Sequence, residues 1–418
     1  SNVDASEHYR RALSQRRFLS NTSDGVAAQI AESLGDVLEQ AGMFGEALAS
    51  FGGALQRTDD PAVKARIMMK RARVHVRVGS YPAAVGQTTA GARLVEDMHG
   101  PDASVALSQL VALASGIRLQ QGRPGLALPL AGRARDLALA NDDRDALARA
   151  YTVLDGALEM LGRPEEAVFA GRARAIYEEL GDTPGVATVD NNVGVRAYDE
   201  GRWDDAVAAY SRAQEEFRLS GNLPQAALCG ANIGEVLVSQ GRLDEAEPIL
   251  RDAVRDLRSA DFADLVIFAE IQLARLDLLR ARFAEACESL ERLQSEANQL
   301  GQRDIALEAA LHLADGLISS GAPDRALEVL GAAESEAGDE AALYEAGLFR
   351  VRARAALDLD REDEAWNLAT QGLEVAREQG LVYEQALIHR IRGRAPASSG
   401  QPDLEEADRL LQVLGVIG

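Results

Sequence analysis

Cysteine is almost absent from this chain of 418 residues, which contains only Cys229 and Cys287. The two thiols lie far apart in the sequence and lack the CxxC spacing of metal and redox motifs. Two cysteines in so long a chain do not form a disulfide framework, which favours a reducing compartment and predicts a cytoplasmic protein. Long apolar runs are also missing, because no stretch approaches the roughly 18 residues of a membrane span. We therefore expect no membrane partner.

Positive charge and aromatic side chains are scarce as well. The 44 basic residues, all arginine except Lys64 and Lys70, are outnumbered by 66 acidic ones, and the formal net charge is −22. Repulsion between this surface and phosphate groups opposes nucleic acid as a partner. Aromatic residues make up only 5% of the chain, whereas Ala and Leu dominate, a composition that favours helices.

Signatures of catalysis and of metal binding are missing too. Neither lysine follows a glycine, which excludes a P-loop, and the GxGxxG, GxSxG and HExxH motifs do not occur. The histidines lack the spacing of metal ligands; they are His8, His75, His99, His312 and His389. Carboxylates are abundant but are usually solvated on a helical surface. We predict that the chain is not an enzyme and has no catalytic residue, metal site or cofactor.

A repeat of about 40 residues runs through the whole chain. A glycine followed five positions later by alanine recurs, as in Gly201 with Ala206 and Gly241 with Ala246. Seven residues before each turn position stands a small residue, except at Asp155. Glycine ends a helix by adopting a left-handed conformation, so each repeat predicts a helix-turn-helix. The turns are expected near Gly42, Gly79, Gly122, Gly162, Gly201, Gly241, Ala281, Gly321, Asp360 and Gly400.

The order of residues within each copy resembles the tetratricopeptide repeat (TPR). A small residue is followed after seven positions by glycine, then by an aromatic residue, alanine, a large residue and alanine. Tyr81, Trp203 and Phe283 occupy the aromatic position. The resemblance covers essentially the entire chain and implies an all-α fold, an α-α superhelical solenoid of about ten repeats. Copies near 40 residues exceed the usual 34-residue unit, which implies longer helices or connectors.

The phase of the repeat divides the chain into three segments. We expect residues 1–24 to be the second helix of a truncated leading repeat, 25–400 the solenoid, and 401–418 a C-terminal capping helix. The phrases "LGDVLEQAGMFGEALASFGGAL" and "EEADRLLQVLGV" resemble C-terminal TPR regions of bacterial multidomain regulators. In those regulators the repeats follow a nucleotide cyclase or ATPase domain. The resemblance therefore implies that an upstream catalytic domain of the same full-length protein is a candidate partner.

One face of each first helix is the candidate binding surface. If the small residue is position 8, positions 2, 6, 9 and 13 share a face, and in TPRs that face, with position 5 and sometimes 12, lines a concave groove. Position 6 carries amides or histidine, forty residues apart, and carboxamides can hold an extended peptide backbone. We predict a groove that binds a peptide or protein through Asn191, Asn192, Tyr198, Asp199, Asn232, Glu235, Gln272, Arg275, His312 and Asp315.

Three functions fit the sequence at this point. We favour a protein-binding scaffold that regulates a larger bacterial protein. A small-molecule sensor would need an enclosed pocket of roughly 300 to 1,000 Å³ instead of an open trough. A structural spacer or oligomerisation arm would leave the concave face solvated. Two basic stretches, Arg66–Arg77 and Arg350–Arg394, either receive acidic partner segments or pair with acidic neighbours.

Overall fold

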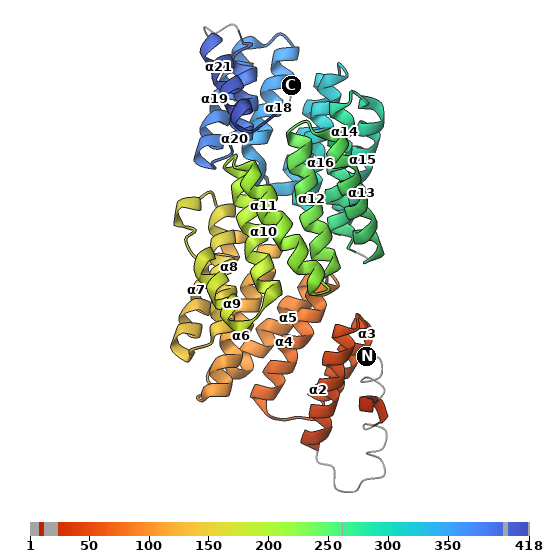
Figure 1. Ribbon diagram of the computed structural model, residues 1–418, viewed down its shortest axis with the longest axis vertical. Helices are drawn as coiled ribbons and strands as arrows, with labels where there is room; N and C mark the ends of the chain where they lie inside the picture. Colours follow the sequence, from red (N-terminus) through yellow and green to blue (C-terminus); the bar gives the residue numbers. More distant parts are fainter. Residues whose placement is uncertain (1–7, 12–23, 261, 396–399, 417–418) are drawn as a thin grey trace. The chain divides into compact units, whose positions relative to one another are not determined.

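The computed structural model describes residues 8–11, 24–260, 262–395 and 400–416, and this part of the chain consists of α-helices without a β-strand (Figure 1). Between Asp24 and Asn141, and again between Thr183 and Val413, each helix packs against its neighbours along the chain. The predicted all-α fold of repeated helix pairs is confirmed. Of the segment 1–24, residues 8–11 are helical, and 1–7 and 12–23 lie outside the described residues. None of the described helices combines the length and apolar character that a membrane span requires.

The chain divides into two compact units. Unit 1 comprises the described residues up to Leu158 together with Ala167–Leu180, and unit 2 comprises Glu159–Glu166 and the described residues from Gly181 onward. The first eight labelled helices are α2 (Asp24–Gln40), α3 (Phe44–Leu55), α4 (Pro61–Arg77), α5 (Tyr81–Val95), α6 (Pro101–Gln120), α7 (Pro124–Asn141), α8 (Arg144–Met160) and α9 (Ala170–Leu180).

The helices of unit 2 continue the same pairing. They are α10 (Thr183–Asp199), α11 (Trp203–Leu219), α12 (Leu223–Ser239), α13 (Leu243–Ser259), α14 (Ala263–Leu279), α15 (Phe283–Leu300), α16 (Arg303–Ser319), α17 (Pro323–Ala337), α18 (Glu345–Asp358), α19 (Glu362–Glu378), α20 (Val382–Arg392) and α21 (Gln401–Val413). Short 3₁₀ turns, η2 (Pro164–Glu166) and η3 (Gly338–Tyr344), precede α9 and α18. The α21 helix occupies the segment expected to cap the solenoid.

The turn inside each pair contains a residue in the left-handed region. Gly201 and Gly321 have φ of 74° and 83°, and the two turn positions without glycine, Ala281 and Asp360, have φ of 59° and 56°. After Gly201, the Arg202 N–H donates to the carbonyl of Ala197 at 2.7 Å, which closes the end of the first helix. The repeat geometry therefore imposes the left-handed conformation whatever the side chain.

Exchanging the turn residues should change stability in opposite directions. We expect Ala281→Gly to raise the free energy of unfolding of unit 2 by about 0.5 kcal/mol or more, because its Cβ is strained at positive φ. Gly321→Ala should lower it by about 1 kcal/mol. Nothing lies within 4 Å of the Cβ that this alanine would add, so the loss comes from the backbone alone.

Both tryptophans of the chain, Trp203 and Trp366, lie in unit 2, so fluorescence-detected urea unfolding measures this unit. A loss of stability on Ala281→Gly would show that the turn is not strained.

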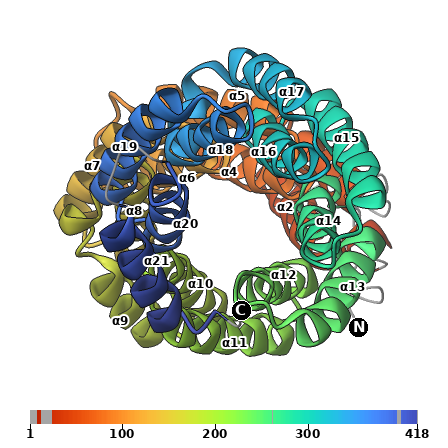
Figure 2. The same cartoon turned by 90° about the horizontal axis from the view of Figure 1, so that it is seen from above.

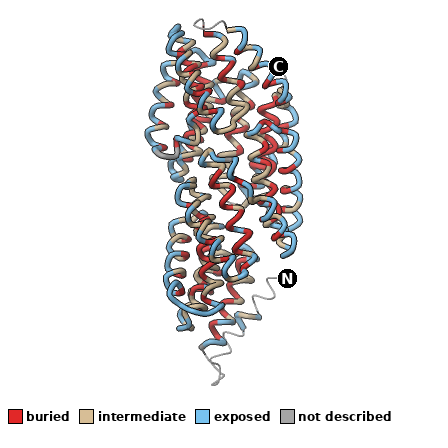
Figure 3. Tube along the Cα trace, turned by 90° about the vertical axis from the view of Figure 1, so that its left-hand side faces the viewer, coloured by how far each residue is buried: buried red, intermediate tan, exposed pale blue. Residues whose placement is uncertain are grey.

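The small residue of each first helix allows the second helix to approach closely. A Cβ on Gly194 would lie 2.6 Å from the ring of Tyr210, and one on Gly234 would lie 2.4 Å from Leu250 Cδ2. Both large residues are almost fully buried, at 3% and 0% exposed. Figure 3 shows the buried residues along the sides of the helices that face one another. The two helices of each of these pairs therefore share a tightly packed core.

Asp155, the exception at the small position, is a buried helix cap. Its side chain is 4% exposed, and its carboxylate accepts hydrogen bonds from the N–H groups of Phe169, at 2.9 Å, and Ala170. These donors open α9, which starts only at Ala170, after the 3₁₀ turn η2. The division between the two units falls at this helix pair. The carboxylate therefore replaces the usual close contact with a polar one.

Candidate functional site

The first helices of unit 2 surround a cavity of about 810 Å³, called here the unit 2 cavity. Figure 2 shows α10, α12, α14, α16, α18 and α20 on the inner side and α11, α13, α15, α17 and α19 outside. Each inner helix contributes to the lining, which includes Phe268 and Glu308 at repeat position 2, His312 at position 6 and Arg275 at position 9. The lining face is the one that the repeat phase assigns to the groove.

The last helices of unit 2 return to the first ones beside the cavity. The Trp203 ring stacks on Tyr198, with centroids 5.7 Å apart, and meets the Tyr383 ring edge-on at 5.3 Å. Gln240 Nε2 donates to the carbonyl of Leu414 at 3.3 Å, a contact across 174 residues of sequence. Side chains from the two ends of unit 2 therefore meet, and Tyr198 and Tyr383 both line the cavity.

Acidic and basic residues alternate at repeat position 9 around the wall of the unit 2 cavity. Glu235, Arg275, Asp315 and Arg354 follow one another at this position. Arg275 Nη1 lies 3.4 Å from Glu235 Oε1, and Arg354 Nη1 lies 2.9 Å from Asp315 Oδ1. Arg275 also donates to Ser239 Oγ at 3.1 Å. The two arginines are thus committed to acidic partners on neighbouring helices.

Arg350 joins three inner helices. Its side chain is 8% exposed and donates to Asp315 Oδ2 at 2.9 Å and to Glu384 Oε2 at 2.7 Å. Burial raises the pKa of Asp315, but the guanidiniums of Arg350 and Arg354 outweigh burial and leave that pKa below its ordinary value. Asp315 is therefore ionised at neutral pH, and the three groups tie α16 to α18 and α20.

Two carboxyl groups of the wall have no such cation. Within the described part of the chain, neither Asp199 nor Glu308 forms an ion pair, and Glu308 accepts one hydrogen bond, from Gln272 Nε2 at 3.0 Å. Burial and the carboxylates of Glu235 and Glu159 raise the pKa of Asp199 to about 7. Burial and Glu235 also raise the pKa of Glu308. Both carboxyl groups are partly protonated at neutral pH.

His312 is a neutral side chain in this wall. Burial and the positive charge of Arg275 hold the pKa of His312 well below its ordinary value. A neutral imidazole offers one donor and one acceptor. Together with Asn232, it presents hydrogen-bonding groups to the cavity without adding charge.

Most of the predicted site residues line the cavity. They are Tyr198, Asp199, Asn232, Glu235, Arg275, His312 and Asp315.

The three remaining predicted residues do not line the cavity. Gln272 is fully buried, at 0% exposed, because it bonds to Glu308 and Arg275. Asn191 Oδ1 accepts from Asn232 Nδ2 at 3.1 Å, and Asn192 is half-buried outside the lining. The amides at position 6 therefore do not form a continuous open row.

Several lining residues were missed by the sequence reasoning. Glu308 stands at position 2, which the repeat phase assigns to the groove, so its signal was available. Tyr210 reaches the cavity from an outer helix, because Gly194 leaves room above it. Tyr383 and Glu384 come from α20, whose return to the first helices has no signature in any single repeat.

The basic stretch of α4 is neutralised by α2. Arg66 donates to both carboxylate oxygens of Glu32 at 2.9 Å, and Lys70 Nζ lies 2.8 Å from Glu32 and 2.7 Å from Asp36. In unit 1 the basic stretch therefore pairs with acidic neighbours.

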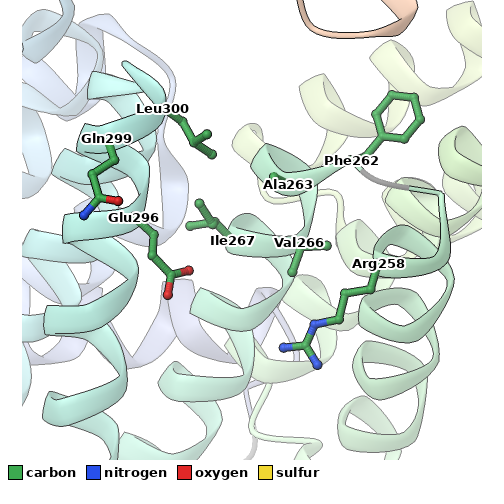
Figure 4. A pocket seen from close by; sticks show the side chains of 8 residues that line it. All are labelled: Arg258, Phe262, Ala263, Val266, Ile267, Glu296, Gln299 and Leu300. Atoms are coloured by element: carbon green, nitrogen blue, oxygen red, sulfur yellow. The ribbon is translucent and has the colours of Figure 1, made fainter. Parts of the chain in front are cut away.

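A second cavity in unit 2, of about 330 Å³, lies at the ends of α13, α14 and α15. Figure 4 shows Val266 and Ile267 between Arg258 on one side and Glu296 and Leu300 on the other. Arg258 also pairs with Glu270. This smaller cavity has few converging polar groups. Among the described residues, no cluster of His, Cys, Asp and Glu could hold a metal ion.

Residues 185–259, which span α10 to α13, match the family model of the tetratricopeptide repeat. This segment of unit 2 resembles tetratricopeptide repeats. These repeats supply Tyr198, Asp199, Asn232 and Glu235 to the cavity. A comparison with curated protein sequences found no match to the chain.

Solved structures resemble the chain in fold. The Rap conjugation gene regulator of plasmid pLS20, in complex with the Phr* peptide, is 11% identical, with a TM-score of 0.58 over 82% of this chain and 96% of that one. A Rap protein complexed with competence and sporulation factor is 14% identical, with a TM-score of 0.50 over 79% and 99%. A signal transduction ATPase with numerous domains and a tetratricopeptide repeat sensor, from Pyrococcus horikoshii, is 16% identical, with a TM-score of 0.53 over 87% and 54%.

Proposed function

We propose that the unit 2 cavity binds a short peptide or an extended segment of a partner protein, and that the chain is a non-enzymatic regulatory scaffold of the bacterial cytoplasm. The observation that carries this proposal is the shared lining, in which six successive inner helices turn polar and aromatic side chains into one cavity of about 810 Å³. Solved structures of similar fold, in complex with the Phr* peptide and with competence and sporulation factor, support it.

The chemistry of the lining suits a peptide. Asn232 and His312 can donate to and accept from a peptide backbone, which carries one donor and one acceptor per residue. Phe268, Leu278 and Leu311 add apolar surface for side chains. The segment belongs either to a separate protein or to an upstream catalytic domain of a longer polypeptide.

Filling the cavity should abolish peptide binding. We expect a library of peptides of about seven residues, incubated with the full chain, to yield binders in the micromolar range typical of weak recognition. Val195→Trp and Leu279→Trp place bulk at lining residues that are 39% and 57% exposed, and each should weaken binding by about 30-fold or more. Affinity selection with mass spectrometry, followed by calorimetry, measures this.

Leu219→Trp is the matched control, because Leu219 is 76% exposed at the end of the outer helix α11 and does not line the cavity. Equal binding by all three variants would place the peptide elsewhere, and an absence of binders would remove the proposal.

A small-molecule ligand is the second candidate. The volume of about 810 Å³ falls within the range of small-molecule sites. The return of α20 and α21 beside the cavity also favours enclosure over an open trough. A metabolite library screened against the same variants distinguishes the two ligands.

A further inference from the structure

The charges around the unit 2 cavity do not balance. Its carboxyl groups outnumber its cations, and each cation is already paired. Arg275 is held by Glu235, Arg354 by Asp315, and Arg350 by Asp315 and Glu384. The carboxyl groups of Asp199 and Glu308 are left over, on α10 and α16. A ligand that supplied a cation would give these two carboxyl groups a partner of opposite charge.

The two surplus carboxyl groups line the same cavity as Glu235 of α12, and the three groups are called here the acidic patch. Burial, and after it the charge of Glu235, raises the pKa of both Asp199 and Glu308. Asp199 also faces Glu159 of α8 and Glu200, whereas Glu308 also faces Asp304 of its own helix and Arg275 of α14. Arg275, which faces Glu308 from α14, is engaged by Glu235, Gln272 and Ser239. Among the described residues that line the cavity, each arginine is therefore already paired with a carboxylate.

Two tyrosines border the patch. Tyr198 and Tyr210 line the cavity, and burial together with the charge of Glu235 raises the pKa of each phenol, so both side chains are neutral. Tyr198 stacks on Trp203 and Tyr210 is 3% exposed, so these rings add a neutral border to the carboxyl groups. A lining with unpaired carboxyl groups, in which each arginine is already paired, suits a guanidinium or an ammonium group and disfavours an anion.

We propose that the peptide bound by unit 2 carries a cationic group that docks against Asp199 and Glu308. The inference rests on the proposed peptide function and specifies the ligand: a basic side chain, or the free amino end of the peptide. An arriving cation stabilises both carboxylates, so binding releases the protons that burial retains on them in the empty cavity. Neutral peptides lack this contribution, and acidic peptides are repelled by the patch.

Matched peptide pools test the charge requirement on the full chain. Acetylated and amidated peptides of about seven residues are prepared as three pools that share all other positions and fix one as Arg, Gln or Glu. We expect the Arg pool to bind about tenfold more tightly than the Gln pool, the size of one charge-assisted hydrogen bond, and the Glu pool to bind more weakly still. A Gln pool with a free amino end identifies an N-terminal ammonium as the source.

Conservative variants locate the effect. Glu308→Gln and Asp199→Asn keep the shape of each side chain and should each reduce the preference for Arg over Gln several-fold, with little change in binding of the Gln pool. Glu328→Gln, at an exposed position on the outer helix α17, should leave the preference unchanged. Tryptophan fluorescence verifies the fold of each variant.

The outcomes separate this inference from the proposed function. Equal binding of the Arg and Gln pools, or a preference that survives both variants, would overturn the cation site while peptide binding stands. Binding by no pool would overturn both.

The pH dependence supplies a second measurement. Guanidinium stays charged throughout, so only the carboxyl groups titrate, and affinity for the Arg pool should rise between about pH 6 and about pH 8. The rise should be smaller in the doubly substituted Asp199→Asn/Glu308→Gln chain, in which Glu235, whose pKa burial also raises, still titrates. A flat profile in the unmodified chain would contradict proton release at these groups.

Discussion

Replacing Arg350 with methionine is expected to lower the free energy of unfolding of unit 2 by about 3–5 kcal/mol, the usual cost of breaking a buried ion pair from one side. Methionine preserves much of the side-chain volume but removes the partner of Glu384 and one of the two arginines that hold Asp315. Arg350 is 8% exposed on its side chain and contacts both Asp315 and Glu384. Fluorescence-detected urea unfolding reports the change through Trp203 and Trp366.

Arg352 on the same helix provides the matched control. It pairs with Glu334, but its side chain is 29% exposed, so Arg352→Met should cost less than about 1 kcal/mol. Adding Glu384→Gln to Arg350→Met should restore part of the loss, because one unpaired buried charge disappears. Equal losses for Arg350→Met and Arg352→Met would mean that burial adds nothing to the pair.

At acidic pH, the free energies of unfolding of the Arg350→Met variant and the unmodified chain should differ less than at neutral pH. The pKa of Asp315 is depressed in the folded state, so its contribution is present above the unfolded pKa of about 4 and is lost as pH falls below it. The variant keeps only the share that Arg354 supplies and therefore has less to lose. The difference in free energy of unfolding should be smaller near pH 3 than near pH 7, and a difference that widens in acid would contradict the assignment.

The inward face of unit 2 could be predicted because it depends on periodicity alone. Once the small residues set position 8, a rotation of about 100° per residue places Phe268, Glu235 and His312 on one side of their helices. The same phase located turns at Ala281 and Asp360, where no glycine marks them, because the geometry of the pair demands a positive φ.

Periodicity could not predict which inward polar side chains bond to their neighbours and which face the cavity. Gln272 and His312 occupy the same repeat position, yet Gln272 is sealed by Glu308 and Arg275 while His312 faces the cavity. The difference arises from side chains on neighbouring helices, over distances near 3 Å that no periodicity encodes. Enclosure by α20 also escapes prediction, because it depends on the accumulated rotation between successive repeats.

The excess of carboxyl groups in the cavity could be identified only by combining the repeat phase with the ion pairs that the structure shows. Phase alone places Asp199 and Glu308 among many carboxylates of a strongly acidic chain, where most are solvated. Only the pairing of Arg275, Arg350 and Arg354 with other partners identifies these two as unmatched. Composition therefore opposes nucleic acid as a partner, and the pairing of side chains in the cavity specifies where a cationic group fits.

In unit 1 the largest effect is expected for Asp155→Ala, which removes the acceptor that starts α9. Two backbone N–H groups, of Phe169 and Ala170, would lose their partner beside a residue that is 4% exposed, at a cost of about 3 kcal/mol. Alanine is the small residue that other repeats carry at this position, so packing alone predicts a neutral or stabilising change. Hydrogen exchange followed by mass spectrometry distinguishes the two, because a loss of 3 kcal/mol accelerates exchange in α8 and α9 by roughly 100-fold. Asp145→Ala, which breaks a partly exposed pair with Arg149 on the same helix, should change exchange less than about threefold. If both variants exchange alike, the carboxylate of Asp155 is not what holds the start of α9, and close packing would have to explain why this pair differs from the rest.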